Sequence, residues 1–292
     1  MPLPNHYQSY FSRYLPVPEP PAFTVKDKLR AALTTPVTYA MPVGENEVPL
    51  NEYLGRRLRI EFLGLISCTH CGRRSKKSFG QGYCYPCFQK LARCDSCIVK
   101  PENCHFAQGT CREPEWGQQF CMTEHIVYLA NSSGLKVGIT RASQVPTRWI
   151  DQGAVQALPV LRVATRHQSG LAEILFGASV ADKTNWRAML KGPAEPLDLA
   201  TEAAALLARH RNGLEELQIR FGPDAIRTLD AATVPIDYPV LEYPQKPQSL
   251  NLDKTPLIEG VLLGIKGQYL ILDCGVLNVR NFTAYHVRLA VA

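Results

Sequence analysis

The sequence contains no apolar run long enough to cross a membrane. A transmembrane helix needs about 18 to 20 consecutive apolar residues, and no window of this 292-residue chain approaches that length. The opening residues, MPLPNHYQSYFSRYLPVPEPP, lack the apolar segment that a signal peptide requires. The chain also has no evident motif for a small-molecule cofactor. We therefore expect a cytoplasmic protein that makes no membrane contact.

Positive charge is concentrated in one part of the chain. The formal net charge is +6, and residues 51–100 carry ten Lys and Arg against three Asp and Glu, a local charge of +7. The rest of the chain is therefore close to neutral. A concentrated basic field is typical of proteins that bind polyanions, so we expect DNA or RNA as a partner. The alternative is a solvated basic surface with no partner.

Nine of the ten cysteines lie between residues 68 and 121. The first four form two Cys-x2-Cys pairs separated by twelve residues, and they are Cys68, Cys71, Cys84 and Cys87. Each pair places two sulfurs on one tight turn, and two such turns can enclose one tetrahedral ion. Disulfides are rare in a reducing cytosol. The spacing therefore predicts a structural zinc site.

The following cysteines offer more ligands than one further ion can take. A zinc site holds four ligands, and we assign the second site to Cys94, Cys97, Cys104 and Cys111. The alternates are Cys121, His105 and His125. Four-sulfur sites leave no position for a catalytic water, so both ions are expected to be structural. Cys274, in the apolar stretch LILDC, is expected to be a small buried residue.

The residues from His125 onward predict a small α/β unit. Two β-branched or aromatic runs, IVYLA and LKVGIT, flank the turn Asn131-Ser132-Ser133-Gly134 and predict a hairpin. A short helix is expected in residues 144–153, a third strand in 155–166, and an amphipathic helix beginning at Ser169. The predicted order is strand, strand, helix, strand, helix, helix.

This order of elements resembles a GIY-YIG nuclease domain. The resemblance rests on VYLA in the first strand, KVGIT in the second, and Arg148, Glu173 and Asn185 in the following helices, and it covers residues 125–192. With the preceding segment SCTHCGRRSKKSFGQGYCYPCFQKLARCDSC, the whole chain resembles an uncharacterised bacterial family in which zinc knuckles precede a GIY-YIG-like core. That family carries no assigned activity.

The nuclease resemblance implies roles for five residues. Tyr128 would help to activate the attacking water, and Arg148 would meet the charge that develops on the scissile phosphate. Glu173 would hold a single Mg²⁺ or Mn²⁺ ion. Asn185 would support the site from the last helix. Lys136 occupies the place of the second motif tyrosine, which favours phosphate binding and puts water activation in doubt.

Each of these side chains also has a structural interpretation. Tyr128 can be an amphipathic core residue, Arg148 a surface arginine, and Glu173 a solvated helix residue. Three functions therefore remain open. The chain can be a metal-dependent phosphodiesterase acting on DNA or RNA, a nucleic-acid-binding module without catalysis, or a zinc-stabilised scaffold for protein interactions.

The predicted fold class is α+β with several modules, as expected for this length. The segments are an N-terminal arm and strand (1–66), a zinc-binding segment (67–124), the GIY-YIG-like unit (125–192), a helical segment (193–231), and a proline-rich linker with C-terminal strands (232–292). The helical segment is expected to break near Asn212-Gly213. We expect the strand in residues 56–67 to pair with the C-terminal strands in a β-layer.

Overall fold

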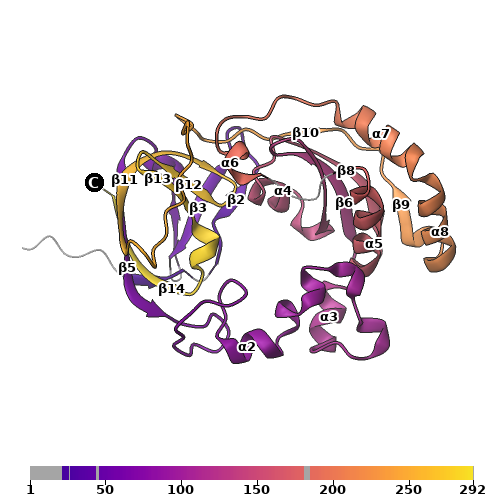
Figure 1. Cartoon of the computed structure of the whole chain (residues 1–292), viewed down its shortest axis with the longest axis horizontal. Coiled ribbons are helices and arrows are strands. Elements are labelled where there is room, and N and C mark those ends of the chain that lie inside the picture. The colour runs from indigo at the N-terminus through magenta and orange to yellow at the C-terminus, as the bar shows by residue number, and fades with distance from the viewer. Residues whose placement is uncertain (1–21, 26, 44–45, 181–184, 292) are drawn as a thin grey trace, which may run out of the picture.

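The computed structural model describes residues 22–25, 27–43, 46–180 and 185–291, so the first 21 residues of the predicted N-terminal arm lie outside the described residues. The chain mixes helices with three antiparallel sheets (Figure 1). The α-helices in these ranges are α2 (Tyr85–Lys90), α3 (Pro114–Phe120), α4 (Thr147–Asp151), α5 (Arg166–Gly177), α6 (Trp186–Met189), α7 (Leu199–Arg209) and α8 (Arg211–Phe221). The 3-10 helices are η1 (Asn51–Tyr53), η2 (Ala92–Cys94), η3 (Ser96–Ile98), η4 (Pro101–Asn103), η5 (Phe106–Gln108), η6 (Ala142–Gln144), η7 (Pro223–Ala225) and η8 (Val279–Phe282).

The first sheet joins the two ends of the chain. Its strands follow the order β1-β14-β5-β11-β12-β13. Their bounds are β1 (Ala22–Thr24), β5 (Arg57–Ile66), β11 (Leu257–Lys266), β12 (Tyr269–Leu272), β13 (Gly275–Asn278) and β14 (Tyr285–Val291). Strand β5 pairs antiparallel with both β11 and β14, which confirms the predicted pairing of the early strand with the C-terminal strands. A smaller sheet of β2 (Arg30–Ala32), β3 (Thr38–Val43) and β4 (Asn46–Pro49) lies beside it and was not predicted.

The second large sheet contains the predicted hairpin. Its strands are β6 (His125–Asn131), β7 (Leu135–Arg141), β8 (Gln156–Val163), β9 (Ile226–Thr228) and β10 (Val234–Pro235). Strand β6 lies between β7 and β8, and β9 and β10 both pair with β8. The turn falls at residues 132–134, and the order β6, β7, α4, β8, α5, α6 follows the predicted succession of elements.

Helices cover one face of this sheet because its strands present apolar side chains on alternate positions. Val127 and Leu129 of β6 pack with Phe176 of α5 and with residues of α7 and α8. The helical pair α7 and α8 is confirmed, but it breaks at His210, before the predicted Asn212-Gly213.

The predicted N-cap of α5 was wrong. Thr165, and not Ser169, begins this helix, because the Thr165 hydroxyl accepts a hydrogen bond from the Gln168 backbone while the Gln168 side chain accepts one from the Thr165 backbone.

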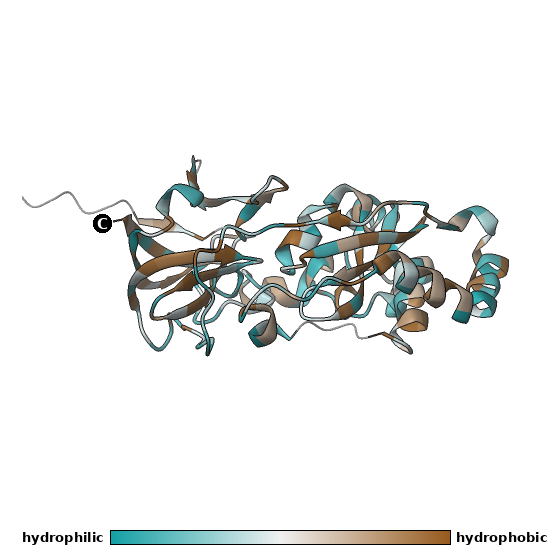
Figure 2. Cartoon of the chain, turned by 90° about the horizontal axis from the view of Figure 1, so that it is seen from above, coloured by the Kyte–Doolittle hydropathy of each residue, from teal (hydrophilic) through white to brown (hydrophobic). Residues whose placement is uncertain are grey.

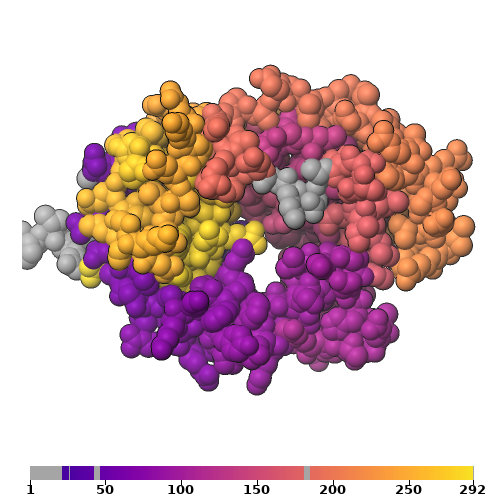
Figure 3. Space-filling model, in the orientation of Figure 1, coloured from indigo at the N-terminus to yellow at the C-terminus, as the bar shows by residue number. Residues whose placement is uncertain are grey.

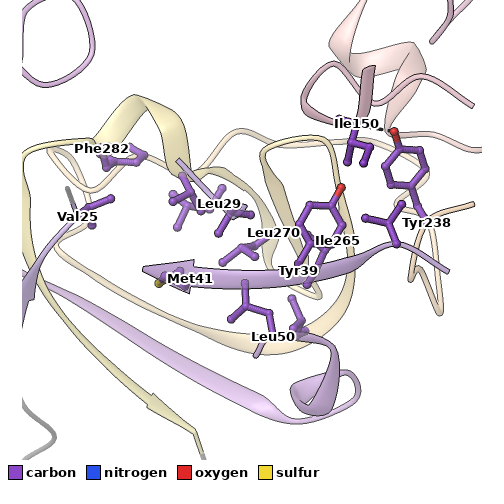
Figure 4. Packing of buried hydrophobic residues seen from close by; sticks show 14 of the residues in the cluster. Val25, Leu29, Tyr39, Met41, Leu50, Ile150, Tyr238, Ile265, Leu270 and Phe282 are labelled. Carbon is purple, nitrogen blue, oxygen red and sulfur yellow. Dashed lines mark hydrogen bonds between the residues drawn. The ribbon is translucent and has the colours of Figure 1, made fainter. Parts of the chain in front are cut away.

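The opposite face of β6 shares one core with the first sheet. Tyr128 and Ile150 belong to the same buried cluster as Tyr39 and Leu270. Tyr238 joins the two sides, since its hydroxyl donates hydrogen bonds to the carbonyl oxygens of Ala154 at 2.8 Å and Ile150 at 3.3 Å (Figure 4). Seen from above, hydrophobic residues follow the strands of both sheets, and the loops are mainly hydrophilic (Figure 2).

The cysteine-rich segment closes the molecule into a ring-like shape. It leaves the first sheet at the end of β5, passes through α2 and α3, and enters the second sheet at β6 (Figure 1). The space-filling view shows an opening bounded by this segment, the C-terminal strands and the α/β unit (Figure 3). None of the helices in the described ranges has the length and hydropathy of a membrane span.

Candidate functional site

The four cysteines of the first group come together as the spacing predicts. One potential ligand atom from each of Cys68, Cys71, Cys84 and Cys87 lies within 4.8 Å of the others. The Cys71 and Cys84 sulfurs are 3.7 Å apart, close to the separation of about 3.8 Å expected for two sulfurs bonded to one tetrahedral zinc ion. These residues fit a metal such as zinc, which would join the two knuckles.

Backbone hydrogen bonds shape the first knuckle for this purpose. The Gly72 backbone donates to the Cys68 carbonyl at 2.9 Å, and the Cys68 backbone donates to the Arg73 carbonyl at 2.9 Å. Burial raises the pKa of the Cys68 thiol, but backbone N–H groups of Cys71, Cys84 and His70 together bring that pKa down to about 6. Metals bind the thiolate, so the first knuckle favours a zinc ligand at Cys68, whereas burial and the neighbouring thiols raise the pKa of Cys87, whose proton zinc binding would have to release.

The basic residues that follow the first knuckle face solvent. The exposed side chains are Arg73, Arg74, Lys76 and Lys77. None of these four forms an ion pair with a carboxylate in the part of the chain that the structure describes. Their charge is therefore available to an external anion, as the sequence predicts for a polyanion-binding surface.

The second group of cysteines does not converge as one predicted set. Cys97, Cys104 and Cys111 line one small cavity together with the alternate Cys121. Cys94 does not line this cavity, and its sulfur lies near Gly80, 3.6 Å from the position that an added Cβ there would take. The prediction that Cys274 is buried was wrong, since Cys274 is exposed.

Tyr128 lies at the centre of the α/β unit and is fully buried. Its hydroxyl donates a hydrogen bond to the Gln152 side chain at 2.9 Å and sits over Gly138, where an added Cβ would lie only 2.7 Å away. Burial raises the pKa of Tyr128 to about 12, while nearby Arg148 lowers it and Glu173 raises it. Of the five residues that the nuclease resemblance names, Arg148 and Glu173 are therefore close enough to Tyr128 to act on its pKa.

The other two residues implied by the resemblance have different surroundings. Lys136 pairs across the hairpin with Ala130, two positions from Gly138 on the same side of β7, and it is only 5% exposed. Asn185 caps α6, its side chain accepting from the Ala188 backbone. In the described ranges no hydrogen bond links Asn185 to Tyr128, Arg148 or Glu173.

Two further arginines approach Arg148 from distant parts of the chain. Burial lowers the pKa of both Arg166 on α5 and Arg280 on η8, and the positive charge of Arg148 lowers each further. Glu173 opposes this effect at Arg166, and Asp151 opposes it at Arg280. Arg280 also donates at 2.6 Å to the side chain of Gln81, in the loop between Cys71 and Cys84. The sequence analysis missed Gln152 and Arg166, for which the chain offers no local signal.

The comparisons place the chain in a family. A family model described as "Protein of unknown function (DUF2797)" matches residues 55–287. The chain belongs to this family. The match spans both cysteine groups and the α/β unit, in agreement with the predicted resemblance of the whole chain to an uncharacterised family. No curated protein and no solved structure matches the chain. The description gives the DUF2797 family no activity, so its function has to be argued from these residues.

Proposed function

We propose that the protein binds nucleic acid, with a phosphate-binding site beside the central opening. The observation that carries the proposal is that the positive charge of Arg148 on α4 acts on two other arginines, Arg166 on α5 and Arg280 on η8. Like charges held close together repel one another, and a phosphate group bound among them would offset that repulsion. Guanidinium groups are also suited to bidentate contact with phosphate oxygens.

The exposed basic residues of the first knuckle extend this surface. Arg280 contacts Gln81, which lies in the loop between Cys71 and Cys84 that also carries Arg73 to Lys77, so Arg280 is connected to this basic loop. A strand whose phosphates contact both regions would neutralise several positive charges at once. The proposal places the protein in a reducing cytoplasm, where cysteine thiols remain available as zinc ligands.

Salt dependence tests this proposal. Binding of short single- and double-stranded DNA and RNA should weaken steeply between about 50 and 200 mM salt, because each neutralised phosphate releases counterions. The quadruple Ala variant of Arg73, Arg74, Lys76 and Lys77 should reduce the slope of log affinity against log salt by about three.

A second quadruple variant with the same change in net charge tests whether the reduced slope comes from net charge alone. The control replaces Arg209, Arg211, Arg220 and Arg227, which are exposed on or after α7 and α8, and it should leave the slope unchanged. Equal effects of the two quadruple variants, or no binding at low salt, would refute the proposed surface and leave the zinc-stabilised scaffold as the surviving function.

A second candidate function is phosphodiester cleavage in a GIY-YIG-like site. It is favoured by the position of Glu173 and Arg148, which both act on the pKa of Tyr128. Glu173 would hold Mg²⁺ or Mn²⁺, and Arg148 would stabilise the charge on the phosphate. The raised pKa and full burial of Tyr128 support a hydroxyl that donates a hydrogen bond, and they weigh against a base that activates water.

Glu173→Gln separates cleavage from binding. If the site is catalytic, the variant should lose metal-dependent cleavage and keep its affinity, since one negative charge near the phosphate is removed. Arg148→Ala should lower cleavage by around two orders of magnitude. Absence of cleavage by the unaltered protein with either metal, compared with EDTA, would leave the non-catalytic binding function. Cleavage that Glu173→Gln leaves unchanged would show that the site lies elsewhere.

A further inference from the structure

Four cysteines from separate turns surround one small cavity next to α5. Cys97 belongs to η3, Cys104 follows η4, Cys111 lies between η5 and α3, and Cys121 ends α3. The cavity has a volume of about 10 Å³. This is roughly the space of one water-sized sphere, so it can take a single ion but not an ion with its own water.

We propose that Cys97, Cys104, Cys111 and Cys121 bind a second zinc ion through four sulfurs. Zinc takes four thiolates in tetrahedral structural sites, and the four residues offer that number around one position. Cys121 therefore replaces Cys94 in the ligand set predicted from the cysteine spacing. The four sulfurs are not within 4.8 Å of one another as those of the first cluster are, so the ion would draw them inward.

The surroundings of the cavity supply the charge that such a site needs. A zinc ion with four thiolates carries a net negative charge, which is costly to bury without cations nearby. Two arginines lie beside Cys121: Arg166, whose backbone contacts that of Cys121, and Arg141, whose guanidinium lies 4.8 Å from the ring centroid of the neighbouring Phe120. The Nε atom of Arg166 is buried and has no hydrogen-bond partner among the described residues, and a zinc-bound sulfur would accept a hydrogen bond from it.

Arg166 also ties the cavity to the α/β unit. Its backbone N–H donates to the Cys121 carbonyl at 2.8 Å, and its Nη2 donates to the Ile98 carbonyl at 2.5 Å. Helix α5 packs directly on η4. The two elements are so close at Gly170 that a Cβ added there would lie 2.5 Å from the Glu102 backbone nitrogen. An ion in the cavity would therefore fix the position of α5, which carries Glu173.

Two other ligand sets compete with the four sulfurs. Ligand atoms of Asp95, Cys97 and His105 lie within 4.8 Å of one another, but Asp95 already accepts from Arg112 at 2.7 Å and from the Ser96 backbone at 2.6 Å. His125 has a buried Nε2 with no partner in the described structure, yet it does not line the cavity. The four-sulfur set is the one that leaves these existing contacts in place.

Native mass spectrometry of the full chain after dialysis against buffer tests the assignment. The unaltered protein should carry two zinc ions, and Cys121→Ala and Cys104→Ala should each carry one. Cys94→Ala is the matched control, since it removes a cysteine of the same segment, and it should keep two. His105→Ala and His125→Ala should also keep two.

A count of one in the unaltered protein, or loss of an ion in Cys94→Ala or either histidine variant, would overturn the assignment. Zinc X-ray absorption of the unaltered protein gives a second measurement that no folding failure can obscure. It should show four sulfurs per zinc at about 2.3 Å. Nitrogen or oxygen in the average first shell would exclude the four-sulfur site and favour the set that contains Asp95 and His105.

Discussion

Replacing Gly138 by alanine should displace Tyr128 from its position in the core. The new methyl group would lie 2.7 Å from the Tyr128 hydroxyl oxygen and 2.8 Å from the ring carbon that bears it. The ring is fully buried, with Trp149 on one side at a centroid separation of 5.9 Å, so it cannot move freely. Overpacking costs about 1 to 3 kcal/mol, and losing the hydrogen bond to Gln152 adds about 1 kcal/mol.

The free energy of unfolding should therefore fall by about 2 to 4 kcal/mol, and the melting temperature by roughly 5 to 15 °C. Urea unfolding followed by tryptophan fluorescence measures the change, because Trp149 lies beside the altered contact. Gly177→Ala is the matched control: nothing lies within 4 Å of the added Cβ, so it should be neutral or slightly stabilising.

A double-mutant cycle identifies the contact responsible. Tyr128→Leu removes the ring. In that background Gly138→Ala should lower the free energy of unfolding less than it does in the unaltered protein, by a difference of at least about 1 kcal/mol. Tyr128→Phe should relieve only the part that comes from the hydroxyl, about 1 kcal/mol, because the ring carbon at 2.8 Å remains, so Tyr128→Leu should give the larger relief. Additive effects of Gly138→Ala and Tyr128→Leu would refute the argued contact between strand β7 and the Tyr128 ring.

Three further outcomes follow from the structure. Cys84→Ala should lower the zinc content by about one ion per chain, and unchanged metal after dialysis would contradict the first cluster. Lys266 is fully buried, and burial lowers the pKa of its amine to about 8. The folded chain therefore releases this proton at lower pH than the unfolded chain does, so the contribution of Lys266 to the free energy of unfolding should rise by about 3 kcal/mol between about pH 8 and 10.5. It is measured as the difference between the unaltered protein and Lys266→Met, because buried groups such as Tyr238, whose pKa is raised, change the total in the opposite direction. Urea unfolding of Lys266→Met should lack that rise, and an equal rise would exclude Lys266 as its source. Thr165→Ala should cost about 1 kcal/mol, whereas Thr165→Ser should cost much less, and equal costs in urea unfolding would contradict the cap.

Local patterns predicted the elements of the α/β unit well. The β-branched runs on either side of Asn131-Ser132-Ser133-Gly134 determine a hairpin because both the strands and the turn are local preferences. The start of α5 was misplaced although the sequence contains Thr165 and Gln168 at capping-box spacing.

The site depends on contacts that no local pattern records. Arg280 comes close enough to Arg148 to feel its charge because the C-terminal sheet and the α/β unit share a core. Cysteine spacing identifies residues able to bind metal, but it does not decide which sulfurs face one cavity. Whether Cys94 or Cys121 faces the cavity depends on the path of the chain from α3 to β6. Tertiary contacts determine that path, and the spacing of the cysteines does not record them.

The pairing of β5 has a consequence for the synthesis of the chain. Glu61 in β5 pairs with Leu257 on one side and with Arg288 on the other, so β5 leaves the ribosome long before either neighbour exists. Hairpins such as β6 with β7 can form in the meantime, because their contacts are close in sequence. The first sheet can close only after residues 257–291 have been synthesised. A product truncated before Leu257 would expose both edges of β5, and aggregation or degradation, rather than partial activity, is the expected fate of such a product.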